Sequence, residues 1–146
     1  AAIAAEAAGV HLPSNAISLD ARRRLGTAAL IGCSAHDRAE LAAAAAAGAD
    51  YATLSPIFPS ASKPAYGPAL GLASLASMVA ARGLPVVALG GIDETNGTAC
   101  IRAGAAGLAV MGGVMAAADP AAVMAGLIRT LGDALAARRG GGHSGA

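Results

Sequence analysis

Short apolar runs alternate with helix-like stretches along this chain, and glycine or proline ends most of these segments. Strands are predicted, in chain order, at residues 9–12, 28–33, 51–57, 85–89 and 107–111. Helices are predicted at residues 20–25, 34–48, 70–82, 95–104 and 119–139. Strands that alternate with helices pair in parallel through right-handed crossovers, so the pattern predicts an α/β fold. Nearly continuous apolar strands also indicate a sheet that is buried on both faces.

Individual residues mark where the predicted helices begin and end. Ser34 is expected to cap the second helix, whose first turn would carry the carboxylate of Asp37. Gly48 would stop that helix, and Pro120 suits the first position of the last one. The glycine-rich residues 140–146 are predicted to be a disordered tail, which leaves residues 1–139 as one domain.

Polar residues and glycines fall just after the predicted strands, where parallel α/β folds bind their ligands. The candidate positions are Ser34, Ser60, Ser62, Lys63, Gly90, Gly91, Gly112 and Gly113. In a closed barrel, the segments after the last two strands form a common phosphate site. Glycines suit such a site because they let backbone N–H groups come close to the anion.

Lys63 is the only lysine in a chain that otherwise uses nine arginines for positive charge. It follows Ser60 and Ser62, whose hydroxyls would face the same way on an extended segment. A compact ammonium on a flexible stem acts as a point charge for a phosphate, whereas a guanidinium is a rigid fork. The segment is therefore a candidate cradle for an anionic oxygen cluster, and the alternative is a solvated loop lysine.

The composition of the chain argues against several classes of binding partner. A net charge of +1 and only three aromatic residues argue against nucleic acid and against an anionic membrane surface. No uninterrupted apolar run of membrane-spanning length and no secretory signal pattern occurs, which favours the cytoplasm. Cys33 and Cys100 show neither metal-site spacing nor a disulfide framework and are interpreted as small buried residues.

Three segments carry a family resemblance. Residues 31–36 are similar to an "I-G-x-S-x-H" strand end, and residues 48–64 to "G-A-D-Y" followed by "G/S-P-[VI]-[FY]-P-T-x-[TS]-K". Residues 87–96 match "V-A-[IL]-G-G-I-x-x-x-N", and residues 9–12 give a weaker fourth match. On these residues the chain resembles the thiamine phosphate synthase and thiazole tautomerase superfamily. The resemblance implies a (β/α)₈ TIM barrel, of which this chain holds about five βα units from the C-terminal part.

The resemblance also implies a reaction. The synthase joins a pyrimidine methyl diphosphate to a thiazole phosphate and releases diphosphate, with Mg²⁺ and cationic side chains on the leaving group. By this resemblance Ser60, Ser62 and Lys63 hold the thiazole phosphate or the departing diphosphate, and Ser34 contacts the diphosphate. The backbone N–H groups at Gly90-Gly91 and Met111-Gly112 bind the thiazole phosphate. The implied catalytic residues are Lys63 and His36, the latter as an acid/base group.

The chain departs from the family pattern at two positions. Where the family has "G-Q-E-D" with a magnesium aspartate, residues 13–16 read Pro-Ser-Asn-Ala, and Asp20 is the only nearby substitute. Gly112 replaces a serine usual after the last strand. The usual carboxylate ligands of Mg²⁺ are thus not found, and no metal ligand is assigned.

Three readings stay open. The first three barrel strands, which carry pyrimidine-binding residues, are expected to be missing, so the chain alone is expected to make no thiamine phosphate. It is a fragment of a synthase, a thiazole tautomerase that needs no magnesium, or a non-catalytic phosphate-binding half-barrel. Its partners would be small phosphorylated substrates and either a missing N-terminal half or further copies of itself.

Several other residues are interpreted as structural. His11 is expected to be a structural strand residue, and arginines 22–24 a solvated helix face. Asp93 and Glu94 are expected to favour a helix dipole. The methionines are interpreted as core filler: Met78, Met111, Met115 and Met124.

Overall fold

The computed structural model describes residues 2–16, 19–60, 67–81 and 83–140. The strands are β1 (Gly9–Leu12), β2 (Leu30–Ala35), β3 (Tyr51–Leu54), β4 (Val86–Leu89) and β5 (Gly107–Ala109). They form one sheet in the order β1-β2-β3-β4-β5, and all neighbours are parallel. The predicted α/β fold with consecutive parallel strands is confirmed.

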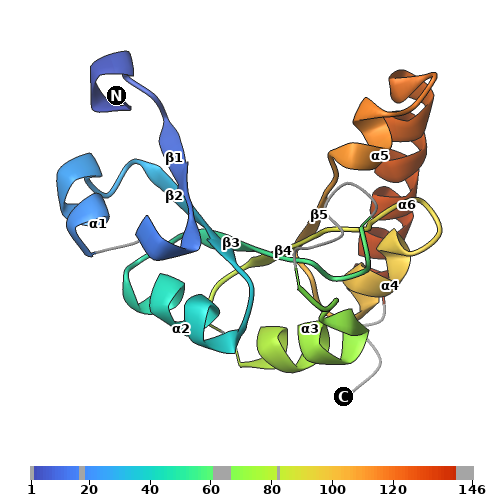
Figure 1. The fold of residues 1–146 in the computed structure, drawn as a ribbon, viewed down its shortest axis with the longest axis horizontal. Coiled ribbons are helices and arrows are strands. Elements are labelled where there is room, and N and C mark those ends of the chain that lie inside the picture. The colour runs from blue at the N-terminus through green and yellow to red at the C-terminus, as the bar shows by residue number, and fades with distance from the viewer. Residues whose placement is uncertain (1, 17–18, 61–66, 82, 141–146) are drawn as a thin grey trace.

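Helices separate the strands along the chain. The α-helices are α1 (Leu19–Leu25), α2 (Arg38–Ala46), α3 (Gly71–Ala80), α4 (Gly97–Arg102), α5 (Gly112–Met115) and α6 (Pro120–Gly140). Two 3-10 turns, η1 (Ile3–Ala5) and η2 (Ser14–Ala16), flank β1. In Figure 1 the sheet is curved, and α2, α3 and α4 lie along its convex side. This is the arrangement of one part of a (β/α)₈ barrel, with the helices outside.

The core lies between the convex face of the sheet and these helices. Side chains at alternate positions of the strands point into it, including Cys33, Ala52, Leu54 and Ala88, all fully buried. Leu75 from α3 and Ile101 from α4 complete the packing. Cys100 is also fully buried, which confirms the interpretation of both cysteines, and burial raises the pKa of each thiol.

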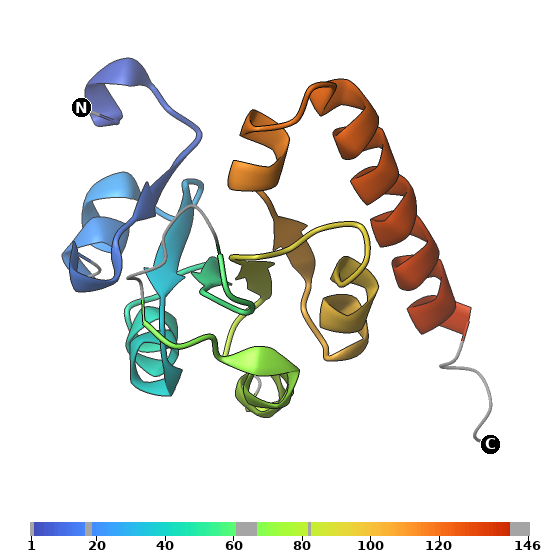
Figure 2. The ribbon, with the colours of Figure 1, turned by 45° about the vertical axis from the view of Figure 1, so that its right-hand side comes forward.

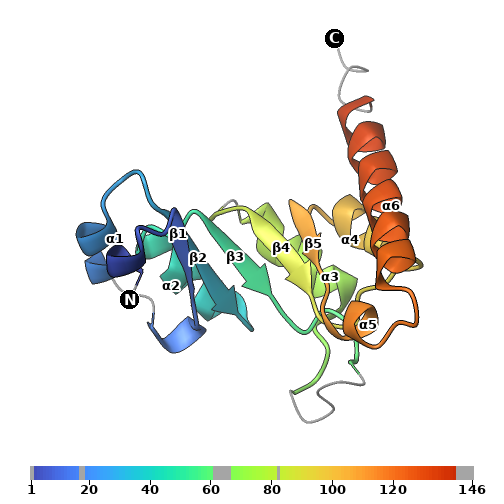
Figure 3. The same cartoon turned by 90° about the horizontal axis from the view of Figure 1, so that it is seen from above.

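The prediction that both faces of the sheet are buried was wrong for this chain. Figure 3 looks onto the concave face, and no helix among the described residues covers it. Leu30, which points to this side, is 54% exposed. Five strands cannot close a barrel of eight, so the side chains that would fill a closed interior remain accessible.

The second helix begins later than predicted. β2 continues through Ser34 and Ala35, which pair with Thr53 and Leu54 of β3. Ser34 is therefore a strand residue, and the prediction that it caps the helix was wrong. Asp37 is the cap: its carboxylate accepts from the backbone N–H of Glu40 at 2.8 Å. Parallel pairing with β3 satisfies the backbone hydrogen-bonding groups near Ser34. The helix cap therefore moves from Ser34 to Asp37, three residues later.

The ends of the last two βα units also differ from the prediction. β5 stops at Ala109, and the glycines expected in a loop form the short helix α5. Pro120 is the first residue of α6, as predicted, and Asp119 accepts from the N–H of Ala122 at 2.9 Å. α6 includes Gly140, one residue beyond the predicted end, and residues 141–146 lie outside the described residues.

α6 lies alongside α4 at the β5 edge of the sheet (Figure 2). By length and composition alone, its residues 120–138 could cross a membrane, which the sequence reading did not anticipate. Arg129 and Asp133 interrupt this stretch, and Leu127 and Ala134 are buried against the domain. We therefore assign α6 to the α/β domain.

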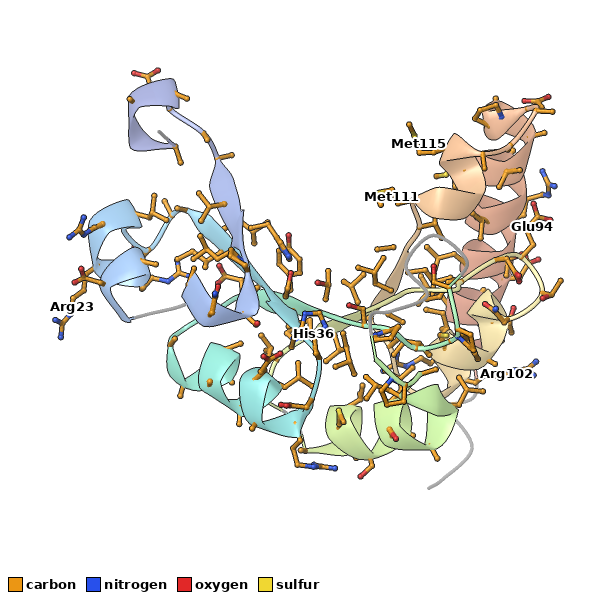
Figure 4. All side chains as sticks on the ribbon, in the orientation of Figure 1. Arg23, His36, Glu94, Arg102, Met111 and Met115 are labelled. Carbon is orange, nitrogen blue, oxygen red and sulfur yellow. The ribbon has the colours of Figure 1, made fainter. Side chains whose placement is uncertain are left out.

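Most of the methionines predicted as core filler are not in the core. Met111 is 58% exposed and Met115 is 79% exposed, and Met124 is also exposed. Met78 does pack against the core, as predicted. In Figure 4, Met111 and Met115 extend from the α5 region toward the open side of the sheet.

Candidate phosphate site at the carboxyl ends of the strands

A sharp corner of two glycines follows β4. Gly90 and Gly91 have φ of 92° and 65°, a region that side chains rarely adopt. A Cβ on Gly91 would lie 2.5 Å from the carbonyl oxygen of Pro59, and one on Gly90 would lie 2.9 Å from Cα of Pro56. Both the conformation and the close approach therefore require glycine here.

The carbonyl groups of this corner are already used. Gly90 accepts from the N–H of Phe58 at 3.0 Å, and Gly91 accepts from Nδ2 of Asn96 at 2.9 Å. A ligand at this corner would therefore have to be bound by its N–H groups. Consecutive N–H groups in a tight turn suit an anion.

Asp93 fixes the segment behind the glycines. Its Oδ1 accepts from Oγ1 of Thr95 at 2.6 Å, from the N–H of Thr95 at 2.8 Å and from the N–H of Asn96 at 3.2 Å. Asn96 in turn accepts from the N–H of Asp93 at 3.0 Å. The Thr95 hydroxyl is the main reason that the pKa of Asp93 is lowered. The turn holds Asn96 against Gly91, a role that the helix-dipole interpretation of Asp93 missed.

The loop after β3 is bonded to the end of β4. The N–H of Ile57 donates to the carbonyl of Leu89 at 2.9 Å, beside the Phe58–Gly90 bond. Leu70 donates back to Pro56 at 2.9 Å. Ser60 lies at the end of this described stretch, next to Pro59 and hence near Gly91. Ser62 and Lys63 lie outside the described residues, so their part in the site stays a prediction.

Met111 and Gly112 follow the neighbouring strand β5. Met111 is the residue before α5, and its carbonyl accepts from the N–H of Met115 at 2.9 Å. In barrels, the loops after the last two strands and a short extra helix commonly bind phosphate. The two glycines after β4 and the start of α5 reproduce that arrangement at adjacent strands.

His36 lies directly after β2, and its ring orientation is fixed. Nδ1 lies 2.8 Å from the carbonyl oxygen of Ser55, and Glu40 accepts from the backbone N–H of His36 at 2.7 Å. A carbonyl oxygen only accepts, so Nδ1 carries the hydrogen and donates it. Nε2 is then the ring nitrogen able to take up a proton, as an acid/base residue requires.

Ser34 belongs to a hydrogen-bonded group that the sequence reading missed. Nε2 of His11 lies 3.1 Å from Oγ of Ser34, and Nδ1 of His11 lies 3.1 Å from the hydroxyl of Tyr51. His11 was expected to be a structural strand residue. The available signal was Gly32, because a glycine inside a strand often marks a close approach of other groups.

The described residues do not fit a magnesium site. No group of three or more His, Cys, Asp or Glu side chains comes together in residues 2–16, 19–60, 67–81 and 83–140. Asp20, the possible substitute ligand, accepts from Nε of Arg24 at 3.2 Å within its own helix and is largely exposed.

The chain is similar to known proteins over most of its length. The family model described as thiamine monophosphate synthase matches residues 1–114. A thiamine-phosphate synthase of Methanoculleus marisnigri is 44% identical over 143 residues, covering 97% of this chain and 66% of that protein. One from Laribacter hongkongensis is 43% identical over 123 residues, covering 84% of this chain and 58% of that protein.

One solved structure is also similar to this chain. Thiamine phosphate pyrophosphorylase from Pyrococcus furiosus superposes with a TM-score of 0.78 at 29% identity, covering 92% of this chain and 64% of that protein. The chain therefore spans less than two thirds of the length of each of these relatives.

Proposed function

Since this chain belongs to the thiamine monophosphate synthase family, we propose that it supplies the phosphate-binding part of a thiamine phosphate synthase. That enzyme would join a pyrimidine methyl diphosphate to a thiazole phosphate, release diphosphate and serve thiamine biosynthesis. The observation that carries the proposal is the Gly90-Gly91 corner beside the start of α5, with both of its carbonyls engaged by the protein. This corner would bind the phosphate of the thiazole.

The second substrate group would bind along the same edge of the sheet. Ser34, at the carboxyl end of β2, would donate to the diphosphate, and Ser60 lies at the end of the loop that packs on Gly91. Ser62 and Lys63 would also bind the anion. Fixed donors around a departing diphosphate act mainly by stabilising the charge that develops on it. Departure of the diphosphate leaves a pyrimidine cation, which the ring nitrogen of the thiazole attacks.

In this proposal, magnesium would be bound by residues outside those described. When bound, the ion would neutralise charge on the diphosphate, and its carboxylate ligands would come from elsewhere in the complete barrel. The open concave face and the two sheet edges support completion of the barrel by an N-terminal half or by another copy of the chain. We place the protein in the cytoplasm, where its small phosphorylated substrates would occur.

A thiazole tautomerase is the second candidate function, and the geometry of His36 favours it. The Ser55 carbonyl fixes hydrogen on Nδ1, so Nε2 is the ring nitrogen without a hydrogen in the neutral imidazole, and tautomerisation needs no magnesium. The His36→Asn variant should then lose tautomerisation of thiazole phosphate while its melting temperature stays close to native. Unchanged turnover would remove this candidate.

The third reading, a non-catalytic half-barrel that only binds phosphate, predicts binding without turnover. The two catalytic candidates and the non-catalytic half-barrel share the same phosphate site, so the binding of thiazole phosphate is tested first. Thiazole phosphate is titrated into the native chain by calorimetry, and the same titration is made with Gly91→Val. The matched control is Gly26→Ala, because Gly26 also has a positive φ of 78° but has open space around its Cβ position.

We expect the native chain and Gly26→Ala to bind thiazole phosphate alike, and Gly91→Val to lose the binding. Equal affinity of Gly91→Val and the native chain would reject the site.

A further inference from the structure

The side chains of His11, Ser34 and Tyr51 form one chain of hydrogen bonds on the concave face. The register of the sheet places His11, Gly32 and Tyr51 in one row across β1, β2 and β3. Ser34 lies two residues beyond Gly32, nearer the carboxyl end of β2. The bonds run from the Tyr51 hydroxyl to His11 Nδ1, and from His11 Nε2 to Ser34 Oγ, each 3.1 Å long.

Gly32 makes room for this arrangement. A Cβ on Gly32 would lie 2.2 Å from Cζ of Tyr51 and 2.5 Å from Nδ1 of His11. The two rings therefore occupy the space that a side chain on β2 would take, with their centroids 5.6 Å apart. Tyr51 and His11 are held in register by the strands, not merely close on a mobile surface.

The direction of the hydrogen bonds decides what Ser34 can offer. A neutral imidazole has one donor and one acceptor nitrogen. If Tyr51 donates to Nδ1, then Nε2–H donates to Ser34, and the Ser34 hydroxyl keeps its own hydrogen for a ligand. In the reverse arrangement, Ser34 donates to Nε2 and presents only lone pairs, which repel an anion.

The phenol favours the first direction. A phenol is a stronger acid, hence a stronger hydrogen-bond donor, than the aliphatic hydroxyl of serine. We propose that Tyr51 and His11 are positioning residues that orient Ser34 as a hydrogen-bond donor to the anionic group of the substrate. The proposal rests on the proposed function for the identity of that group, a diphosphate, but the direction of the relay is a property of the ligand-free chain.

The test therefore has two readouts. ¹⁵N chemical shifts of the His11 ring report its tautomer in the ligand-free 146-residue chain, and calorimetry reports the affinity for inorganic diphosphate. In the native chain we expect the Nε2–H tautomer. In Tyr51→Phe, which keeps the ring but removes the donor to Nδ1, the Nδ1–H tautomer should gain population. Diphosphate affinity should fall roughly threefold to tenfold, the range for one hydrogen bond.

Two further variants complete the comparison. Ser34→Ala removes the proposed donor itself, so Tyr51→Phe added to it should cost no further affinity. Ser77→Ala is the control, since Ser77 lies on α3, where its hydroxyl accepts from Arg38 at 2.6 Å on the other side of the sheet. It should leave both readouts unchanged.

The outcomes separate the two proposals. A tautomer that is unchanged in Tyr51→Phe overturns the relay, whatever the affinity. A changed tautomer in a chain that does not bind diphosphate supports the relay and rejects the diphosphate site. A changed tautomer with native affinity overturns the positioning role, because Ser34 would then bind the anion without the relay.

Discussion

Arg22 and Asp50 join α1 to the segment before β3 through a hydrogen-bonded ion pair of 2.6 Å. Oδ2 of Asp50 also accepts from the N–H of Ile31 at 2.7 Å, and Arg22 donates to the carbonyls of Gly48 and Ala29. Arg22 was expected to lie on a solvated helix face, but its side chain is only 22% exposed. The pair lies at the amino ends of the strands, opposite the candidate site, where it serves stability.

Removing the Asp50 carboxylate should therefore weaken the fold. Asp50→Ala loses the bonds to Ile31 and Arg22, and we expect the free energy of unfolding to fall by about 1–2 kcal/mol, since partial exposure reduces the value of each charged bond. The control is Asp20→Ala, which breaks the exposed Asp20–Arg24 pair and should cost less than about 0.5 kcal/mol. Urea unfolding of both variants measures the difference, and equal losses would contradict the prediction.

The same carboxylate predicts a pH dependence. The Ile31 N–H, followed by the Arg22 bond, lowers the pKa of Asp50 in the folded chain. A lowered folded pKa means that the stabilisation is present above the unfolded value of about 4 and is lost as pH falls through the folded pKa. Asp50→Asn should therefore lose less stability than the native chain between about pH 7 and pH 3. Parallel stability curves in urea would contradict this.

Gly32 should tolerate no side chain. A Cβ there meets the Tyr51 ring and His11 at less than van der Waals distance, so Gly32→Ala should cost roughly 1–3 kcal/mol of unfolding free energy. Gly107→Ala is the matched control on β5, where the nearest atom to a Cβ is 3.9 Å away. Thermal unfolding should show a lower melting temperature for the first variant only. A Gly32→Ala chain as stable as Gly107→Ala would mean that the rings move aside at little cost.

Lys63→Ala should weaken the binding of thiazole phosphate by roughly 1.5–3 kcal/mol, the range for a hydrogen bond to a charged group. Lys63→Arg should recover only part of this, because a planar guanidinium does not replace a compact ammonium. The melting temperature without ligand should hardly change, since the sequence predicts Lys63 on a loop, where single substitutions have small effects. Calorimetry at moderate salt measures the affinities. An unchanged dissociation constant for Lys63→Ala would leave Lys63 as ordinary surface charge.

Local patterns in the sequence were sufficient for the order of the elements. The apolar strands, Gly26 and Gly48 after their helices, and Pro120 at the start of α6 each act through neighbouring residues, so the five parallel strands could be predicted. The positions of His36 and Gly90-Gly91 after strands followed for the same reason. Here local preference and the final fold agree.

Only the tertiary structure decided which distant groups meet. Ser34 is a strand residue because β3 pairs with it. Asp50 contacts Arg22 because the fold brings two segments far apart in sequence together at the amino ends of the strands. The contact of His11 with Tyr51 spans forty residues and depends on the register of three strands and on the space over Gly32. Register and close approach are properties of paired strands, and no single segment contains them.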